Sequence, residues 1–339
     1  MKIVVDAFGG DHSPEEVIKG VSLALNKEQG FSIVLTGKKE TIQALMQEYG
    51  CDKERVEIVD APEVITNDDT PTLALRQKTN SSLVKCFDIL NASEDAKSMV
   101  TAGSTGAALT GAVLMLKRIK GILRPGLAPL LPAIKNQNQV MLIDCGAIAD
   151  PKPQNLVQFA KMGSAFMKAV AKVENPRVGL LSNGSEDSKG NERNKEAFEL
   201  LKQADINFLG NLEGRDIISG DYDVVVADGF SGNIALKACE GTALGIFKLI
   251  KDGIMKGGLR AKLGYLLLKS VFKQIKTKMD YNDNGGAVLL GLKKIVIKSH
   301  GSSKAKSICA SILQAKQMVD AKVVEKIEEV IEIESSRQD

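Results

Sequence analysis

Short apolar runs alternate with longer amphipathic stretches along almost the entire chain, and this alternation limits the fold more than any other feature. The runs predicted to be strands are KIVV (2–5), SIVLT (32–36), VEIV (56–59), SMVT (98–101), VMLI (140–143), RVGLL (177–181), INFLG (206–210), DVVVA (223–227) and KIVIK (294–298). Stretches with the spacing of helices lie between most of them. Strands that alternate with such helices form βα units, so the sequence predicts a mainly parallel sheet that helices cover on both faces.

The chain reads as one unit rather than several. None of its 339 residues form a linker rich in proline, serine or glycine, and no internal repeat is visible. We therefore predict a single α/β catalytic domain over residues 1–339, with a two-lobed arrangement that shares the sheet as the alternative. Ser13, Pro14 and Glu16 predict a capping box with proline at the first helical position, and KPQNLVQ at 152–158 repeats the proline start.

The composition excludes several classes of protein. A formal net charge of +3, an aromatic content of 4% and the absence of tryptophan argue against a nucleic-acid-binding protein. The five cysteines are dispersed without a CxxC pair, as is typical of reduced thiols in a cytosolic protein. The apolar run before Asp6 is too short for a signal peptide, and no apolar window reaches the roughly 18 residues of a membrane span. We therefore expect a cytoplasmic protein.

Small residues dominate the loops that follow six of the predicted strands. These loops are VVDAFGGDHSP, TAGSTGAAL, LIDCGAIAD, LLSNGSEDSKGNE, ADGFSGN and SHGSSK. The carboxyl ends of parallel strands share one edge of a sheet, and each loop leads into a helix whose free N–H groups favour an anion. The sequence therefore predicts that several of these loops together hold an anion.

The motifs of common anion-binding enzymes are missing. The chain has no GxxxxGK[ST], no GxGxxG and no GxSxG motif, and its only histidines are His12 and His300. This shortage of bases, nucleophiles and metal ligands suits a reaction whose nucleophile arrives already charged, such as inorganic phosphate attacking a thioester. The departing thiol has a pKa of about 8.5 and leaves with little help. The protein then needs only to hold phosphate against the carbonyl carbon and to stabilise the oxyanion.

Taken together, these loops resemble those of the acyl-ACP:phosphate acyltransferases of bacterial phospholipid synthesis, where ACP is acyl carrier protein. The shared motifs, in order, are VDAFGGDHSPEE, TAGSTGA, RIKGILRPGLAPLLP, CGAIADPKPQNLVQFAKMG, SKGNE, DVVVADGFSGNIALKACEG and DYNDNGGAVLLGL with VIKSHGSS, and they cover roughly residues 1–320. The resemblance implies transfer of a long-chain fatty acyl group from acyl-ACP to inorganic phosphate. It also implies a three-layer α/β/α sandwich similar to isopropylmalate dehydrogenase, acting as a homodimer with no metal or organic cofactor.

The resemblance further implies a membrane-associated enzyme that supplies acyl phosphate to a glycerol-3-phosphate acyltransferase. It assigns Lys189 as the cation for phosphate or the oxyanion, and Asp228 as the residue that orients Lys189 or the thiol. A solvated loop lysine and a structural turn aspartate are the alternatives. Asn191 and Asn233 are assigned as donors to the same oxygens, and a helix cap is the alternative for each. The residues assigned to the phosphate cradle are Gly9, Gly10, Asp11, His12, Ser104, Thr105, Gly106, Ser231 and Gly232.

Two positions depart from the family pattern in residues that could contact substrate. Ser104 and Ile148 stand where the family has asparagine. Serine can still donate a hydrogen bond, whereas isoleucine cannot. A polar role for the side chain at position 148 is therefore lost in this chain.

Residues 254–280 are predicted to form a projecting basic amphipathic helical segment. Leucines recur at 259, 263 and 267, and no acid lies between Asp252 and Asp280. Such a helix can lie on an anionic membrane, bind acidic ACP or pack across a dimer interface, whereas a helix covering a core normally carries acids as well. The membrane association of the family favours the first role. The predicted contact residues are Leu259, Arg260, Leu263, Leu267, Lys269 and Lys273.

Two other functions compete with acyl transfer. An NAD-dependent decarboxylating dehydrogenase of related fold needs a cluster of aspartates for a divalent metal, and Asp144 and Asp150 are only loosely placed for that. A non-catalytic scaffold on the membrane surface is supported by the basic segment alone. We expect phosphate and ACP as partners, and no nucleic acid.

Overall fold

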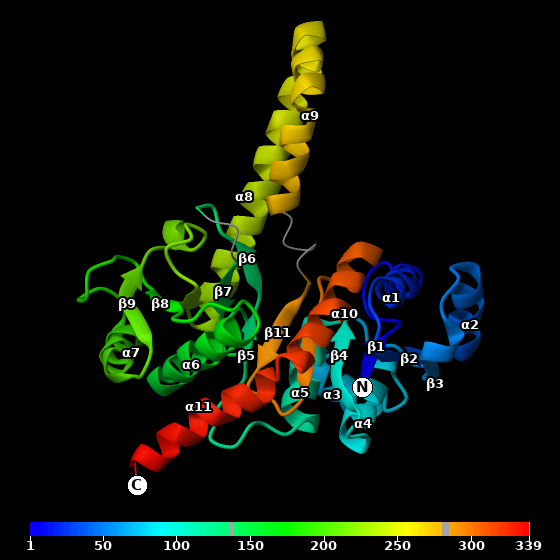
Figure 1. The fold of residues 1–339 in the computed structure, drawn as a ribbon, viewed down its shortest axis with the longest axis horizontal. Helices are drawn as coiled ribbons and strands as arrows, with labels where there is room; N and C mark the ends of the chain where they lie inside the picture. The colour runs from blue at the N-terminus through cyan, green and yellow to red at the C-terminus, as the bar shows by residue number, and fades with distance from the viewer. Residues whose placement is uncertain (136–138, 280–284, 339) are drawn as a thin grey trace.

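Two β-sheets form the centre of the protein in the computed structural model, which describes residues 1–135, 139–279 and 285–338 (Figure 1). The seven-stranded sheet has the order β3 (Val56–Asp60), β2 (Ser32–Gly37), β1 (Lys2–Asp6), β4 (Ala96–Thr101), β12 (Ile295–Lys298), β11 (Ala287–Leu290) and β5 (Gly126–Ala128). The five-stranded sheet has the order β6 (Leu130–Pro132), β7 (Gln139–Ile143), β10 (Val224–Val226), β8 (Arg177–Leu181) and β9 (Asn207–Leu212).

Most neighbouring strands pair in parallel, as predicted. Strand β1 is parallel to β2 and β4, and β10 is parallel to β7 and β8. The antiparallel pairs are β11 with β12, β11 with β5, and β6 with β7. All nine predicted strands are present, and β5, β6 and β11 are the strands that the sequence pattern did not predict.

The chain passes from one sheet to the other at Pro129, which separates β5 from β6. Backbone hydrogen bonds connect the sheets here: Cys145 N donates to Leu127 O at 2.9 Å, and Leu142 N donates to Pro129 O at 3.1 Å. The described residues therefore form two sheets joined at one edge rather than a single shared sheet.

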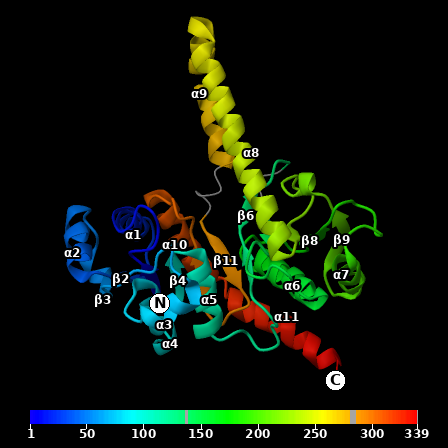
Figure 2. The same cartoon turned by 180° about the vertical axis from the view of Figure 1, so that it is seen from behind.

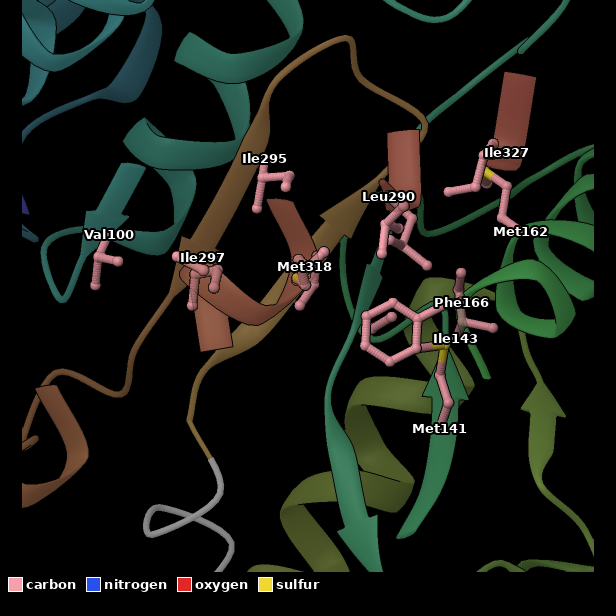
Figure 3. Close-up of a cluster of buried hydrophobic side chains, with 14 of the residues drawn as sticks. Val100, Met141, Ile143, Met162, Phe166, Leu290, Ile295, Ile297, Met318 and Ile327 are labelled. Carbon is pink, nitrogen blue, oxygen red and sulfur yellow. The ribbon is translucent and has the colours of Figure 1, made fainter. Parts of the chain in front are cut away.

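Helices cover both faces of the sheets and give the predicted three layers. The helices are α1 (Glu15–Lys27), α2 (Lys39–Glu48), α3 (Pro71–Gln77), α4 (Ser82–Ala92), α5 (Thr105–Met115), α6 (Pro153–Ala169), α7 (Glu192–Gln203), α8 (Gly229–Lys256), α9 (Gly258–Met279), α10 (Ala305–Asp320) and α11 (Val323–Gln338). In β1, Ile3 and Val5 face a cluster that includes residues of α1 and α10, while Val4 faces a second cluster that includes residues of α4. One cluster reaches both sheets, because Ile297 of β12 and Ile143 of β7 belong to it together with Phe166 of α6 (Figure 3).

One predicted helix start is wrong and the other is confirmed. Helix α1 begins at Glu15, and Ser13 Oγ donates to Gly10 O at 2.8 Å instead of accepting from the helix. The Glu16 carboxylate accepts from Ala305 N at 2.8 Å, so it binds the first residue of α10 instead of closing a capping box. Helix α6 does begin with Pro153.

Helices α8 and α9 project from the body as a long pair, which we call the hairpin (Figures 1 and 2). The predicted segment 254–280 covers only the end of α8 and all of α9, whereas exposed apolar side chains already occur earlier in α8, for example at Leu244 and Leu249. Residue 280 lies outside the described residues. Leu259, Leu263 and Leu267 are 87%, 61% and 77% exposed. No helix in the described part of the chain is both long and apolar enough to cross a membrane.

Candidate functional site

A cleft of about 240 Å³ lies where the two sheets meet the start of the hairpin. Four of the six small-residue loops contribute to it: those after β4, β7, β10 and β12. The lining residues are Asn67, Gly103, Thr105, Leu127, Pro129, Leu130, Cys145, Asn233, Leu236, Lys237, Glu240, Gly285, Gly286, Ala287, Lys298, Ser299, His300 and Gly301. The expectation that strand-end loops gather at one place is therefore confirmed for these four loops.

The first glycine-rich loop packs behind the cleft instead of lining it. A side chain on Gly9 would place its Cβ 2.7 Å from Gly103 N and 2.6 Å from Asp6 Oδ2. Asp11 N donates to Gly301 O at 2.8 Å. Gly9, Gly10 and Asp11 thus hold the loops after β4 and β12 close together, and His12 is exposed.

Three of the predicted polar residues act as helix caps. Asn191 Oδ1 accepts from Asn194 N at 2.9 Å at the start of α7, and Ser104 Oγ accepts from Ala107 N at 3.4 Å at the start of α5. Asp228 Oδ1 accepts from Ser231 N at 2.8 Å at the start of α8. Capping residues satisfy N–H groups that a helix leaves unpaired, so each position has a structural role.

Asp228 also belongs to a buried ion pair. Its Oδ2 lies 2.8 Å from Arg193 Nη2, and Arg193 Nη1 lies 2.6 Å from Asp150 Oδ1. The Asp228 side chain is 7% exposed, whereas that of Asp150 is 93% exposed. The pair therefore fixes the start of α8 against α7, and Asp150 contributes little because it is solvated.

Asp144 organises the loop that follows β7. Its Oδ1 accepts from Leu127 N at 2.8 Å and from Ala147 N at 3.0 Å, and its Oδ2 accepts from Ile148 N at 2.7 Å. Burial raises the pKa of this carboxyl, and the backbone donors oppose the rise. Ile148 O in turn accepts from Gly229 N at 2.9 Å, so position 148 contributes through its backbone even without an asparagine side chain.

Some of the remaining predicted residues lie at the cleft, and others lie away from it. Thr105 and Asn233 line the cleft, and Gly232 sits so close to Asp144 O that an added Cβ would be 2.0 Å away. Lys189 is outside the lining set; its side chain is 46% exposed and lies 3.8 Å from Glu186 Oε1. Gly106 packs near Pro71, where a Cβ would meet Cγ at 2.9 Å.

The cleft contains charged and titratable residues that the sequence analysis did not assign to the site. Lys237 and Glu240 of α8 form an ion pair at 2.7 Å. Lys298, at the end of β12, is 8% exposed, and burial lowers its pKa to about 8. Burial likewise lowers the pKa of His300, whose Nδ1 lies 2.8 Å from Ser302 Oγ. The available signal for Lys298 was a lysine at the end of an apolar strand, immediately before SHGSS.

The arrangement combines cations with an apolar wall. Lys237, Lys298 and His300 lie with Leu127 and Leu236 around one cavity, together with the hydroxyl of Thr105 and the amide of Asn233. Such a cleft can hold an anion beside an apolar group, and its hydroxyl and amide can donate to the oxygens of a reacting carbonyl.

Comparison with known proteins gives one family along nearly the whole chain. The family model described as "Fatty acid synthesis protein" matches residues 1–326. The chain is 47% identical over 332 residues to a phosphate acyltransferase from Clostridium novyi, with 98% of this chain and 99% of that one covered. A phosphate acyltransferase from Pediococcus pentosaceus is 44% identical over 343 residues, with 100% and 97% covered.

Solved structures share the fold at low sequence identity. A phosphotransacetylase from Streptococcus pyogenes superposes with a TM-score of 0.60 at 20% identity, covering 96% of this chain and 94% of that one. A branched-chain phosphotransacylase from Enterococcus faecalis gives 0.56 at 13% identity, covering 94% and 99%. The chain belongs to the fatty acid synthesis protein family, together with the phosphate acyltransferases, and it is an acyltransferase whose reaction involves phosphate.

Proposed function

We propose that the protein transfers a long-chain fatty acyl group from acyl-ACP to inorganic phosphate. The acyl phosphate product would then serve a glycerol-3-phosphate acyltransferase in phosphatidic acid synthesis. The observation that carries the proposal is the cleft, in which the cations Lys237 and Lys298 and the imidazole of His300 adjoin an apolar wall. The cations suit a phosphate dianion, and the wall suits the acyl chain beside the thioester.

The roles of individual residues follow their positions. Thr105 and Asn233 line the cleft, so we assign them as donors to phosphate or to the oxyanion. Asp228 fixes the start of the helix that carries Asn233, and Ser231 and Gly232 belong to the same turn. Lys189 and Asn191 would approach the substrate from the loop between β8 and α7.

Thiol release from palmitoyl-ACP tests the reaction. We expect release by the purified protein only when inorganic phosphate is present, with a product that hydroxylamine traps as the hydroxamate. Release at the same rate without phosphate indicates a thioesterase that uses water, and no release under either condition contradicts the proposal. Unchanged NADH fluorescence on mixing serves as the control against a dehydrogenase.

The hairpin is proposed to bind an anionic membrane surface as part of this single catalytic unit. Its exposed apolar side chains include Leu249, Leu259, Leu263, Leu267 and Leu268. Between Gly241 and Met279 the sequence has one acid, Asp252, and nine basic residues: Lys248, Lys251, Lys256, Arg260, Lys262, Lys269, Lys273, Lys276 and Lys278. Each lysine or arginine near an anionic surface contributes about 1 kcal/mol, so apolar insertion and charge act together.

Flotation with vesicles checks this surface. We expect the wild-type protein to float with vesicles that contain anionic lipid, and Leu263→Glu and Leu267→Glu to remain at the bottom. Leu114→Glu is the matched control, because Leu114 is 64% exposed on α5, away from the hairpin. No flotation of the wild type contradicts membrane binding. A halved mass of Leu263→Glu in light scattering would instead assign the face to a second copy in a homodimer.

A further inference from the structure

Lys298 occupies an unusual place for a lysine. It is the last residue of β12, in register with Thr101 of β4 in the interior of the seven-stranded sheet, and it is 8% exposed. Its Nζ donates to Ala102 O at 3.3 Å and also to Ser299 O. An ammonium group has three N–H donors, and these two contacts use two of them. Because Lys298 lines the cleft, its third N–H group can donate to a ligand there.

The surroundings of Lys298 leave its charge only partly compensated. Burial lowers its pKa to about 8, and the nearby Asp6 and Asp11 oppose that fall while Lys237 of α8 adds to it. Burial also raises the pKa of the Asp6 carboxyl. His300 lies in the same cleft, and Glu240 pairs with Lys237. Both protonation states of Lys298, the ammonium and the neutral amine, are therefore populated near neutral pH.

Acyl transfer to phosphate needs a proton at one particular step. Attack of phosphate on a thioester gives a tetrahedral intermediate that can expel either phosphate or the thiolate. The second ionisation of a phosphate monoester, a close analogue of inorganic phosphate, has a pKa of about 6, whereas the pKa of an alkyl thiol such as that of cysteine is about 8.5. Phosphate is thus the better leaving group. Although a thiolate can depart with little help, the intermediate returns to substrates more often than it goes forward, and protonation of the sulfur as the C–S bond breaks shifts this balance towards product.

We propose that Lys298 is the proton carrier of the cleft, an inference that rests on the proposed function. An oxygen of HPO₄²⁻ forms the bond to the carbonyl carbon, and the C–S bond breaks with its electron pair moving to sulfur. The Lys298 ammonium gives a proton to that sulfur. The resulting amine takes the proton from the P–OH group of the new acyl phosphate. The products are the free thiol and the acyl phosphate dianion, and Lys298 is again an ammonium.

Substitution by arginine separates proton transfer from simple charge. Lys298→Arg keeps a positive charge and N–H donors for the two carbonyl oxygens, but the guanidinium has a much higher pKa than an amine and does not give up its proton. With palmitoyl-ACP we expect the wild-type kcat to fall above about pH 8, where the ammonium is lost. We expect Lys298→Arg to be slower by about 10²-fold at pH 7.5, with a level profile from pH 7 to 9.5 and an unchanged KM for phosphate.

A second thioester tests the same step without a variant. A palmitoyl ester of 4-nitrothiophenol has a far more acidic leaving thiol, which needs no proton to depart. We expect the wild-type rate with this ester to stay level above pH 8, and the deficit of Lys298→Arg to disappear. Should the enzyme reject this ester, the profiles with palmitoyl-ACP decide alone.

Three outcomes overturn the proposal. The first is a Lys298→Arg variant that retains more than a third of the wild-type kcat, as a phosphate-binding cation would allow. The second is an equal loss on both thioesters, as a structural role would give, and the third is a wild-type kcat that does not fall above pH 8. Thermal unfolding of Lys298→Arg at the same temperature as the wild type shows that a loss of activity is not caused by misfolding. Absence of phosphate-dependent release by the wild type would instead reject the proposed function.

Discussion

Replacing Gly232 with alanine is expected to destabilise the protein by about 3 kcal/mol and to abolish most of its acyl transfer. A Cβ at this position would lie 2.0 Å from Asp144 O and 3.1 Å from the Asp144 carbonyl carbon. Both are backbone atoms next to the end of β7, so no side-chain rotation relieves the overlap, and overpacking of this kind costs about 1–3 kcal/mol. The start of α8 must shift, and Asn233 then moves from the cleft wall.

Two other glycines of α8 provide the matched control. Gly241 and Gly245 have nothing within 4 Å of an added Cβ. Alanine at either position is expected to gain roughly 0.5–1 kcal/mol, because glycine is unfavourable within a helix. Urea unfolding of the three variants gives midpoints and m-values, and together these give the free energy of unfolding of each variant. A Gly232→Ala midpoint at or above that of the wild type would show that the close approach between α8 and Asp144 is not required.

The parallel framework could be predicted from the sequence because its strands are buried on both faces. Such strands appear as unbroken apolar runs, as in β7 and β10. The antiparallel strands lack that signal. Strands β5 and β6 are three residues each, and Pro129 between them looks like an interruption. Only the pairing of β5 with β11 and of β6 with β7 makes them strands.

The site could be predicted as a set of loops, but only partly as a set of residues. Strand ends share an edge within a parallel sheet, so the loops after β4 and β12, and those after β7 and β10, were expected together. The junction of the two sheets brings both pairs of loops to one cleft. Which side chains face the cleft depends on packing between distant elements. Lys298 is separated by 65 positions from Asn233, and both line the same cavity. Asn191 and Asp228, chosen for their polar chemistry, cap helices α7 and α8.

Removing Arg193 is expected to be among the most damaging single changes outside the cleft. Its guanidinium lies 2.8 Å from the Asp228 carboxylate, and the two side chains are 18% and 7% exposed. Arg193→Met leaves Asp228 buried without its counter-charge, and breaking a buried ion pair in this way costs about 3–5 kcal/mol. The loss is expected as a lower urea midpoint at pH 7.

A substitution of Asp228, the other residue of the ion pair, shows whether its uncompensated charge causes the loss of stability in Arg193→Met. Asp228→Asn removes the charge and keeps an oxygen that can accept from Ser231 N, since asparagine is as good a cap as aspartate. We therefore expect Arg193→Met/Asp228→Asn to recover much of the stability that Arg193→Met loses, which a double-mutant cycle measures as a coupling energy. Additive losses would mean that Arg193 acts through its packing alone. Strong coupling would instead show that the ion pair holds α8, the helix that carries Asn233 and continues into the hairpin, against α7.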